Sequence, residues 1–238
     1  MGAEAVNPDD VLVSIGLPIY NGAAQMRSAL DSLLAQTHRN IEIIISDNAS
    51  TDDTAAICRE YVARDPRISY SRNETNIGGL PNFDRVVRLA RGDFFMWAAH
   101  DDWWAPTFVE ANLQNLMQHP DLIASISRVR YVSGDREVFP SQFARADTGP
   151  LNGSMQSNIR RLVANHGMGS RFYSLYVKKV LLDSLPIPTY LGGDIALIVR
   201  TLAFGNYGEV PQVLYARGIH GVSSDQLKLL AGDGKSLH

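Results

Sequence analysis

The sequence predicts an α/β fold in which helices flank both faces of a mostly parallel central sheet. Up to about residue 130, runs of β-branched and other apolar residues alternate with helical patterns, which is typical of parallel strands joined by crossover helices. The segments after these runs are rich in Asp, Asn and Gly, as expected where parallel strands end at a ligand site. The chain has 238 residues and is 45% hydrophobic, so it can bury a sizeable core. Its length allows one large domain or two small ones, and with the fold assigned below we expect a single domain over 1–238.

The first half of the chain is predicted to alternate strands and helices. The first apolar run meets Pro18, which we expect to end its strand. The second helix is expected to turn Ala56, Ile57, Tyr61 and Val62 inward. The expected strands are 11–17, 41–46, 68–70, the apolar run after Asp93, and 122–130, and the expected helices lie around 26–34, 56–62, 81–90 and 106–118.

The pattern is weaker in the second half. Residues 133–153 are rich in Gly, Pro, Ser and charged side chains, which indicates a flexible connection. The expected elements beyond it are a helix over 155–165, a strand over 171–177, a helix introduced by residues 192–194 and running to about 203, a strand over 208–215, a loop over 217–224 and the start of a helix at 227–230.

Composition excludes several classes of partner. The net charge of -3 and the pI near 6.1 give no basic surface for nucleic acid. The single cysteine, Cys58, excludes an internal disulfide, fits a reducing compartment and is expected in the core. Residues 1–10 lack the features of a signal peptide, and no run approaches the roughly 18 apolar residues of a membrane span. We therefore expect a cytoplasmic protein with no integral membrane segment.

Two adjacent carboxylates, Asp101 and Asp102, end the fourth apolar run. Adjacent carboxylates repel each other, and a divalent cation with a preference for oxygen ligands, such as Mn²⁺ or Mg²⁺, relieves that repulsion. An ordinary surface turn before the helix that starts near Pro106 is the alternative, since acids favour helix N-termini. The stretch alone leaves both interpretations open.

Polar residues also follow the other strands of the predicted sheet. Pro18, Tyr20 and Asn21 follow the first, Asp47 and Asn48 the second, and residues 72–79 the third. Because the carboxyl ends of parallel strands meet at one edge of a sheet, we expect all four loops, including the one with Asp101, to open onto one crevice.

These residues carry a resemblance to a known family. The segments 14–22 (SIGLPIYNG), 44–52 (IISDNASTD), and 91–93 (RGD) leading to 100–102 (HDD) together resemble the family 2 glycosyltransferases in order and spacing, over roughly residues 11–130. The resemblance implies the GT-A fold, a Rossmann-like nucleotide-diphospho-sugar transferase fold. It also implies a nucleotide-diphosphate sugar donor bound by the half 11–130, Mn²⁺ or Mg²⁺, and inversion at the anomeric carbon. The acceptor and the catalytic base belong to the half 131–238.

By the same resemblance, site residues can be assigned on this chain. Asp194 is expected to be the catalytic base, with Gly193 where the family often has Glu. The remaining assignments are Pro18, Tyr20 and Asn21 at the nucleoside, Asp47 at the base or ribose, Arg72 and Gly78 at the nucleotide, Asp101 at the donor and the metal, Asp102 and His220 at the metal, and Arg217 at the leaving diphosphate.

Several of these residues also have an ordinary structural explanation. Tyr20 is also explained as a packed loop aromatic, and Asp47 and Asp194 as helix N-caps. Ala99 stands where the family often has the first Asp of Asp-x-Asp-Asp, so one carboxylate ligand is missing from the metal site.

The leading function is therefore an inverting, metal-assisted glycosyltransferase. Its acceptor would be a saccharide, a lipid-linked molecule or another hydroxyl compound, in bacterial polysaccharide or glycoconjugate synthesis, and peripheral membrane association stays open. The alternative is a non-catalytic module that binds nucleotide sugars. A sugar-nucleotide pyrophosphorylase is disfavoured because the loop 18–22 has no Arg or Lys, and an NAD-dependent dehydrogenase because Gly-x-Gly-x-x-Gly is absent there.

Overall fold

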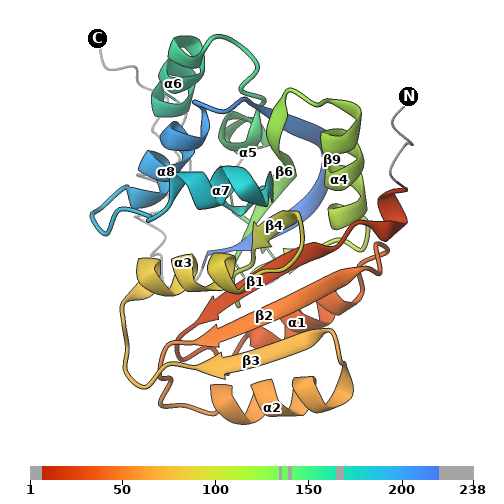
Figure 1. Cartoon of the computed structure of the whole chain (residues 1–238), viewed down its shortest axis with the longest axis vertical. Coiled ribbons are helices and arrows are strands. Elements are labelled where there is room, and N and C mark those ends of the chain that lie inside the picture. The colour runs from red at the N-terminus through yellow and green to blue at the C-terminus, as the bar shows by residue number, and fades with distance from the viewer. Residues whose placement is uncertain (1–6, 134–135, 139–140, 165–168, 220–238) are drawn as a thin grey trace.

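The structure is a computed structural model that describes residues 7–133, 136–138, 141–164 and 169–219. Its centre is one sheet with the strand order β3-β2-β1-β4-β8-β6-β9-β5, and β7 pairs with β6 (Figure 1). The strands are β1 Val13–Ile19, β2 Ile41–Asp47, β3 Ile68–Arg72, β4 Phe94–Trp97, β5 Trp103–Trp104, β6 Leu122–Ser133, β7 Arg136–Glu137, β8 Leu175–Val177 and β9 Asn206–Gly218. The helices are α1 Met26–Leu34, α2 Thr54–Arg64, α3 Gly79–Leu89, α4 Phe108–Gln118, α5 Ser141–Thr148, α6 Met155–Ala164, α7 Lys178–Ser184 and α8 Gly193–Thr201, with 3-10 turns η1 Pro8–Asp10 and η2 Ser170–Tyr173.

The mostly parallel arrangement is confirmed. β1 pairs in parallel with both β2 and β4, β2 with β3, and β6 with β9. β8 is antiparallel to β4 on one side and to β6 on the other, so it joins the two parallel groups into one sheet. The carboxyl ends of β1, β2, β3 and β4 therefore lie at one edge.

The prediction that Pro18 ends the first strand is wrong. β1 continues through Pro18 and Ile19, which pair with Ser46 and Asp47 of β2. Gly16 O accepts a hydrogen bond from Ala98 N on the β4 side, and Ile19 O accepts one from Asn48 N on the β2 side. Since successive residues of a strand point to alternate neighbours, the backbone nitrogen of Pro18 points toward β4, whose pairing with β1 has already ended at Gly16. No ladder hydrogen bond is lost.

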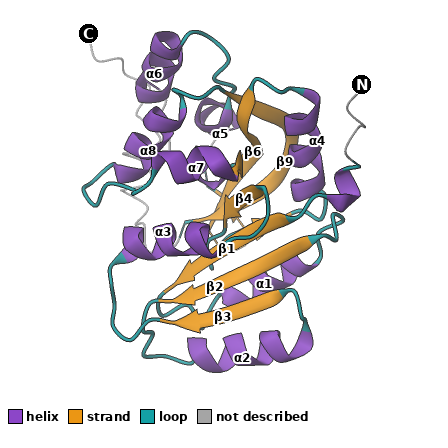
Figure 2. Cartoon of the chain, in the orientation of Figure 1, coloured by secondary structure: helices purple, strands orange, loops and turns teal. Residues whose placement is uncertain are grey.

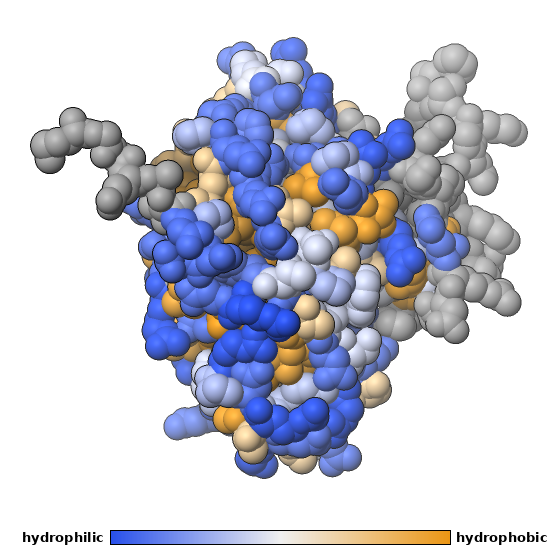
Figure 3. Space-filling model, turned by 90° about the vertical axis from the view of Figure 1, so that its right-hand side faces the viewer, coloured by the Kyte–Doolittle hydropathy of each residue, from blue (hydrophilic) through white to orange (hydrophobic). Residues whose placement is uncertain are grey.

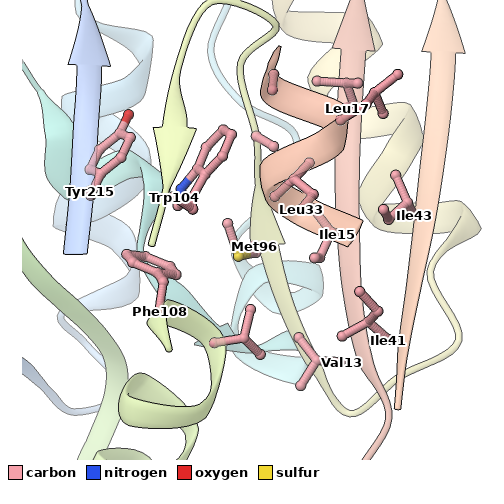
Figure 4. Packing of buried hydrophobic residues seen from close by; sticks show 14 of the residues in the cluster. Val13, Ile15, Leu17, Leu33, Ile41, Ile43, Met96, Trp104, Phe108 and Tyr215 are labelled. Carbon is pink, nitrogen blue, oxygen red and sulfur yellow. The ribbon is translucent and has the colours of Figure 1, made fainter. Parts of the chain in front are cut away.

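Helices cover both faces of the sheet (Figure 2). One apolar cluster packs α1, α2 and α4 against the sheet, and a second packs α3, α6, α7 and α8 against the other face. In the first cluster, side chains of β1, β2 and β4 interdigitate with Leu33, and the ring of Trp104 stacks on Tyr215 at 5.6 Å (Figure 4). Cys58 is fully buried there, as predicted.

Some predicted helices and faces need correction. α2 buries Thr54, Ile57, Cys58 and Tyr61, and it leaves Ala56 and Val62 exposed. The buried stripe follows the spacing i, i+3, i+4, i+7 from the first residue of the helix, so its position is set by where the helix begins. The expected flexible connection contains α5, and α7 and β5 were not predicted.

The surface is predominantly polar. On the face shown in Figure 3, hydrophobic residues form small patches separated by hydrophilic ones. Within the described ranges, no helix is both long enough and apolar enough to span a bilayer.

Candidate functional site

A cavity of about 270 Å³ opens at the carboxyl edge of the parallel strands. It is lined by the ends of β1 and β2, the first turns of α3, the segment after β4, and η2. The lining residues are Pro18, Ile19, Tyr20, Asn48, Gly79, Asn82, Phe83, Ala99, His100, Asp101 and Tyr173. The loops after β1, β2 and β4 thus meet in one crevice as predicted, and the loop after β3 reaches it where α3 begins.

Asn48 ties the loops of this crevice together. Its side-chain oxygen accepts hydrogen bonds from Asn73 Nδ2 at 3.0 Å and Ile77 N at 2.9 Å. Its side-chain nitrogen donates to Asn76 Oδ1 at 2.8 Å and Gly78 O at 3.1 Å. Because nearly all of its hydrogen-bonding capacity is used, this buried amide fixes the 73–78 loop against the end of β2.

Asp47 and Arg72 lie beside the cavity and are not among its lining residues. Asp47 is fully buried and accepts hydrogen bonds from Ser50 N and Tyr70 Oη, both at 2.8 Å. Arg72 Nε lies 3.4 Å from Asp47 Oδ2, and Arg72 Nη2 donates to Ser50 O at 2.8 Å. In this arrangement both side chains brace the loop after β2, and their contact with a nucleotide stays a prediction.

Asn21 has a similar bracing position after β1. Its backbone has φ of 51°, a left-handed conformation that Asn tolerates better than most residues. Its side-chain oxygen accepts a hydrogen bond from Thr51 N at 2.8 Å, and its backbone N–H donates to Ser50 Oγ at 3.0 Å. The neighbouring Tyr20 is 46% exposed at the cavity, so it is free to contact a ligand and is not a packed core aromatic.

The two adjacent acids have opposite environments. Asp102 is buried and accepts hydrogen bonds from Tyr215 Oη and from Gly218 N at 2.9 Å. Burial raises the pKa of Asp102 to about 7, although the positive charge of Arg217 works in the other direction. Asp101 is partly exposed and lines both this cavity and a neighbouring one of about 850 Å³.

A divalent cation fits Asp101 better than Asp102. Within the described residues no hydrogen bond engages the Asp101 carboxylate, so its oxygens are available as hard ligands at the cavity wall. Both oxygens of Asp102 already accept a hydrogen bond. The described part of the chain holds no group of three or more His, Cys, Asp or Glu side chains able to enclose a metal, and His220 lies outside the described residues.

Tyr173 forms the wall of the cavity opposite β1. The guanidinium of Arg217 lies 5.2 Å from the centre of its ring. Burial raises the pKa of the Tyr173 hydroxyl, Arg217 lowers it, and Asp102, Asp101 and Asp194 raise it further. The charges of the three acids and of Arg217 therefore all act on the Tyr173 side chain.

Asp194 is the second residue of α8 and is partly exposed. The N-cap of α8 is Gly192, so the interpretation of Asp194 as that cap is wrong. A Cβ added to Gly169 would lie 3.0 Å from Asp194 Oδ2, which places the carboxylate directly beside the start of η2.

Gly193 departs from the family pattern for a steric reason. A Cβ at this position would lie 1.9 Å from the carbonyl oxygen of Pro188. The chain before α8 packs onto the bare backbone here, so this structure has no room for the Glu that the family often carries.

Other site features were not foreseen. Tyr173 was expected within a strand, and it lies in η2. Arg217 was expected in a loop, and it lies in β9, which extends to Gly218. No local pattern distinguishes Tyr173 from a core tyrosine. Asn48 was expected at the crevice beside Asp47, but its hydrogen bonds to the 73–78 loop were not predicted.

Sequence relatives include a glycosyltransferase of Rickettsia typhi, which is 39% identical over 115 residues, covering 47% of this chain and 35% of the relative. An uncharacterized protein of Mycobacterium bovis is 31% identical over 217 residues, covering 85% of this chain and 58% of the relative. The chain thus spans between about a third and about three-fifths of the length of these curated relatives.

Solved structures share the fold. S. aureus TarS 1-349 in complex with UDP-GlcNAc matches with a TM-score of 0.70 at 18% identity, over 87% of this chain and 58% of that one. The mannosyltransferase PcManGT from Pyrobaculum calidifontis, in complex with GDP-Man and Mn²⁺, matches with a TM-score of 0.59 at 17% identity, over 89% of this chain and 57% of that one. The predicted GT-A fold is confirmed by this likeness.

The family itself follows from the sequence match. The model of the family described as "Glycosyl transferase family 2" matches residues 14–184, which include all of β1 except its first residue, β2 to β4, Asp101 and Tyr173. The chain belongs to glycosyl transferase family 2.

Proposed function

We propose that this chain transfers a sugar from a nucleotide-diphosphate sugar to an acceptor hydroxyl, with inversion and with the help of a divalent cation. The observation that carries the proposal is the placement of Asp101. Its carboxylate lines the cavity at the strand ends, and no hydrogen bond from the described residues engages it. Family membership and the nucleotide sugars in the TarS and PcManGT complexes support a donor of this class.

The donor would lie along the strand ends. Pro18, Tyr20 and Asn21 would border the nucleoside, of which Pro18 and Tyr20 line the cavity. Asp47 would bind the base or ribose. Arg72 and Gly78 are the further nucleotide contacts that we propose from the family resemblance.

The diphosphate would lie against Asp101. The negative charges of the diphosphate and of the Asp101 carboxylate would repel each other. Mn²⁺ or Mg²⁺ bound between them would neutralise that repulsion and stabilise the leaving nucleotide diphosphate. Asp101 would hold the cation, with Asp102 and His220 as further ligands. Arg217, next to Tyr173 at the cavity wall, would add positive charge on the opposite side of the leaving group.

Asp194 would act as the general base. Inverting transfer requires a carboxylate that takes the proton from the acceptor hydroxyl on the face opposite the leaving diphosphate. Asp194 and Asp101 both act electrostatically on Tyr173, and no described residue hydrogen-bonds the Asp194 carboxylate. A partly exposed, unengaged acid near the cavity wall suits this role.

The acceptor would be bound by residues 131–238, within a single domain. A saccharide, a lipid-linked molecule or another hydroxyl compound fits the proposal, in cytoplasmic steps of bacterial polysaccharide or glycoconjugate synthesis. Peripheral membrane association is compatible with it.

The test combines donor binding with turnover. Thermal shifts measured with nucleoside diphosphates and their sugars, with and without Mn²⁺, should show a metal-dependent stabilisation by one nucleotide. Asp101→Asn should remove the metal-dependent part, and release of the nucleoside diphosphate in the presence of an acceptor mixture should be lost with it. Asp93→Asn is the matched control, because Asp93 is an exposed acid at the opposite end of β4.

The outcomes separate the alternatives. Metal-dependent binding without diphosphate release on any acceptor would support the non-catalytic binding module. Absence of stabilisation by every nucleotide, in a folded protein, would refute the proposed function.

A further inference from the structure

We propose that Asp147, in α5, is a positioning residue that sets Arg217 at the leaving diphosphate by way of Tyr131 and Ser170. The inference rests on the proposed function for the role of Arg217. It concerns a segment that the sequence indicated only as a flexible connection, and neither Asp147 nor its partners line the cavity.

Hydrogen bonds link Asp147 to Arg217 in a defined direction. Arg217 Nη1 donates to Ser170 Oγ at 3.3 Å, Ser170 Oγ lies 3.0 Å from Tyr131 Oη, and Tyr131 Oη donates to Asp147 Oδ2. A guanidinium group only donates hydrogen bonds and a carboxylate only accepts them. Arg217 and Asp147 therefore determine the direction of the hydrogen bond between Ser170 and Tyr131. The Tyr131 proton is used on Asp147, and Ser170 must therefore donate to Tyr131 and keep its oxygen lone pairs toward Arg217.

All three linking side chains are fully buried: Asp147, Tyr131 and Ser170 have no exposed surface. A buried carboxylate is unfavourable unless its hydrogen bonds and charge are compensated, and no described residue gives Asp147 Oδ1 a hydrogen-bond partner. The charge is compensated at a distance by two guanidinium groups, because Asp147 is among the groups that raise the pKa of both Arg171 and Arg217 against the effect of burial.

Asp147 also fixes the turn that borders the site. Its Oδ2 accepts a hydrogen bond from the backbone N–H of Ser170 at 2.9 Å, the first residue of η2. The residue before it, Gly169, has φ of 72° and lies against Asp194. The last residue of η2 is Tyr173, which contacts both Arg217 and the cavity. One buried acid therefore holds the turn on which Arg217 rests.

The test compares two buried tyrosines. Tyr131→Phe removes the hydroxyl that links Ser170 to Asp147. Tyr207→Phe removes a hydroxyl that bonds to Thr201, and Tyr207 is not among the described groups that act electrostatically on Arg217. Both rings are almost completely buried, so loss of stability should be similar. Calorimetry with UDP and uridine, or GDP and guanosine, separates diphosphate recognition from nucleoside recognition.

We expect Tyr131→Phe to weaken diphosphate binding about fivefold, as for the loss of one hydrogen bond near 1 kcal/mol, and to leave nucleoside binding unchanged. Tyr207→Phe should leave the ratio of nucleoside diphosphate affinity to nucleoside affinity unchanged. Ser170→Ala should reproduce the effect of Tyr131→Phe. The double variant should lose no more diphosphate affinity than either single variant, because both substitutions interrupt the same series of hydrogen bonds. Asp147→Asn, which removes the charge and keeps the size, should also weaken only diphosphate binding.

Unchanged affinity ratios in the folded Tyr131→Phe and Asp147→Asn variants would overturn the inference while the proposed function stands. If the wild-type protein binds neither diphosphate nor nucleoside, the proposed function fails and this inference fails with it.

Discussion

At the scale of single residues, the four acids assigned to the candidate site fall into two groups. Asp47 and Asp102 are buried, and each accepts at least two hydrogen bonds from backbone or tyrosine donors. Asp101 and Asp194 are partly exposed, and the described residues offer them no hydrogen bond. Carboxylates of the first kind hold loops in place, whereas those of the second kind remain available to a cation or a substrate proton.

This division leads to a prediction for Asp194. Asp194→Asn keeps the size of the side chain and removes the base, so donor affinity should stay within about twofold while turnover falls about 10²- to 10⁴-fold. Steady-state diphosphate release and calorimetric donor binding measure the two effects. Asp183→Asn is the control, because Asp183 is an exposed acid on α7 whose ion pair within the described residues is with Lys179 of the same helix. Near-normal turnover of Asp194→Asn would remove Asp194 from the reaction.

The sequence was informative about which residues stand at strand ends and uninformative about their partners. An apolar run followed by acids is visible locally, so Asp101 and Asp47 could be placed in advance. The partners that engage Asp102 are Tyr215 and Gly218, 113 and 116 positions later in the chain. Such a contact depends on the register between β5 and β9, which no short pattern encodes.

At the scale of elements, β1 and β2 were predictable because they are long apolar runs buried on both faces. Every residue of β1 and β2 is buried, which is the condition under which composition alone indicates a strand. β5 has only two residues and exists because β9 aligns with it, and α5 begins within a stretch rich in Gly, Pro and Ser. Tertiary packing decides such short elements, and local propensity does not.

The beginning of α8 offers a test at this scale. Gly193 is its first residue, and a Cβ there would overlap the carbonyl oxygen of Pro188. Gly193→Ala should therefore lower the free energy of unfolding by about 1–3 kcal/mol, as overpacking does, and should reduce turnover by moving Asp194. Gly79→Ala is a matched control, since Gly79 is the first residue of α3 and an added Cβ meets nothing within 4 Å. Chemical denaturation of both variants gives the comparison, and equal stabilities would contradict the steric argument.

At the scale of the whole molecule, the two halves share one sheet. β8, from the second half, lies between β4 and β6 and pairs Phe95 with Tyr176. The ring of Phe172 stacks on Trp97 of β4 at 4.3 Å. The carboxyl-end crevice therefore has a wall, Tyr173, that reaches it only because this second-half segment is bound to the first-half sheet.

This continuity predicts that residues 1–133 do not fold as an independent unit. Without β8 and η2, β4 would expose an unpaired edge, and the buried ring of Trp97 would lose its contacts with Phe172 and Tyr176. Fully exposing one such aromatic side chain costs about 3 kcal/mol, a large share of the stability of a domain. We expect the whole chain to unfold in one transition, with far-UV circular dichroism and tryptophan fluorescence coinciding, and the fragment 1–133 to show no cooperative transition. A fragment that melts cooperatively, or two separate transitions in the whole chain, would mean that the two halves are separate domains and that the crevice lies between them.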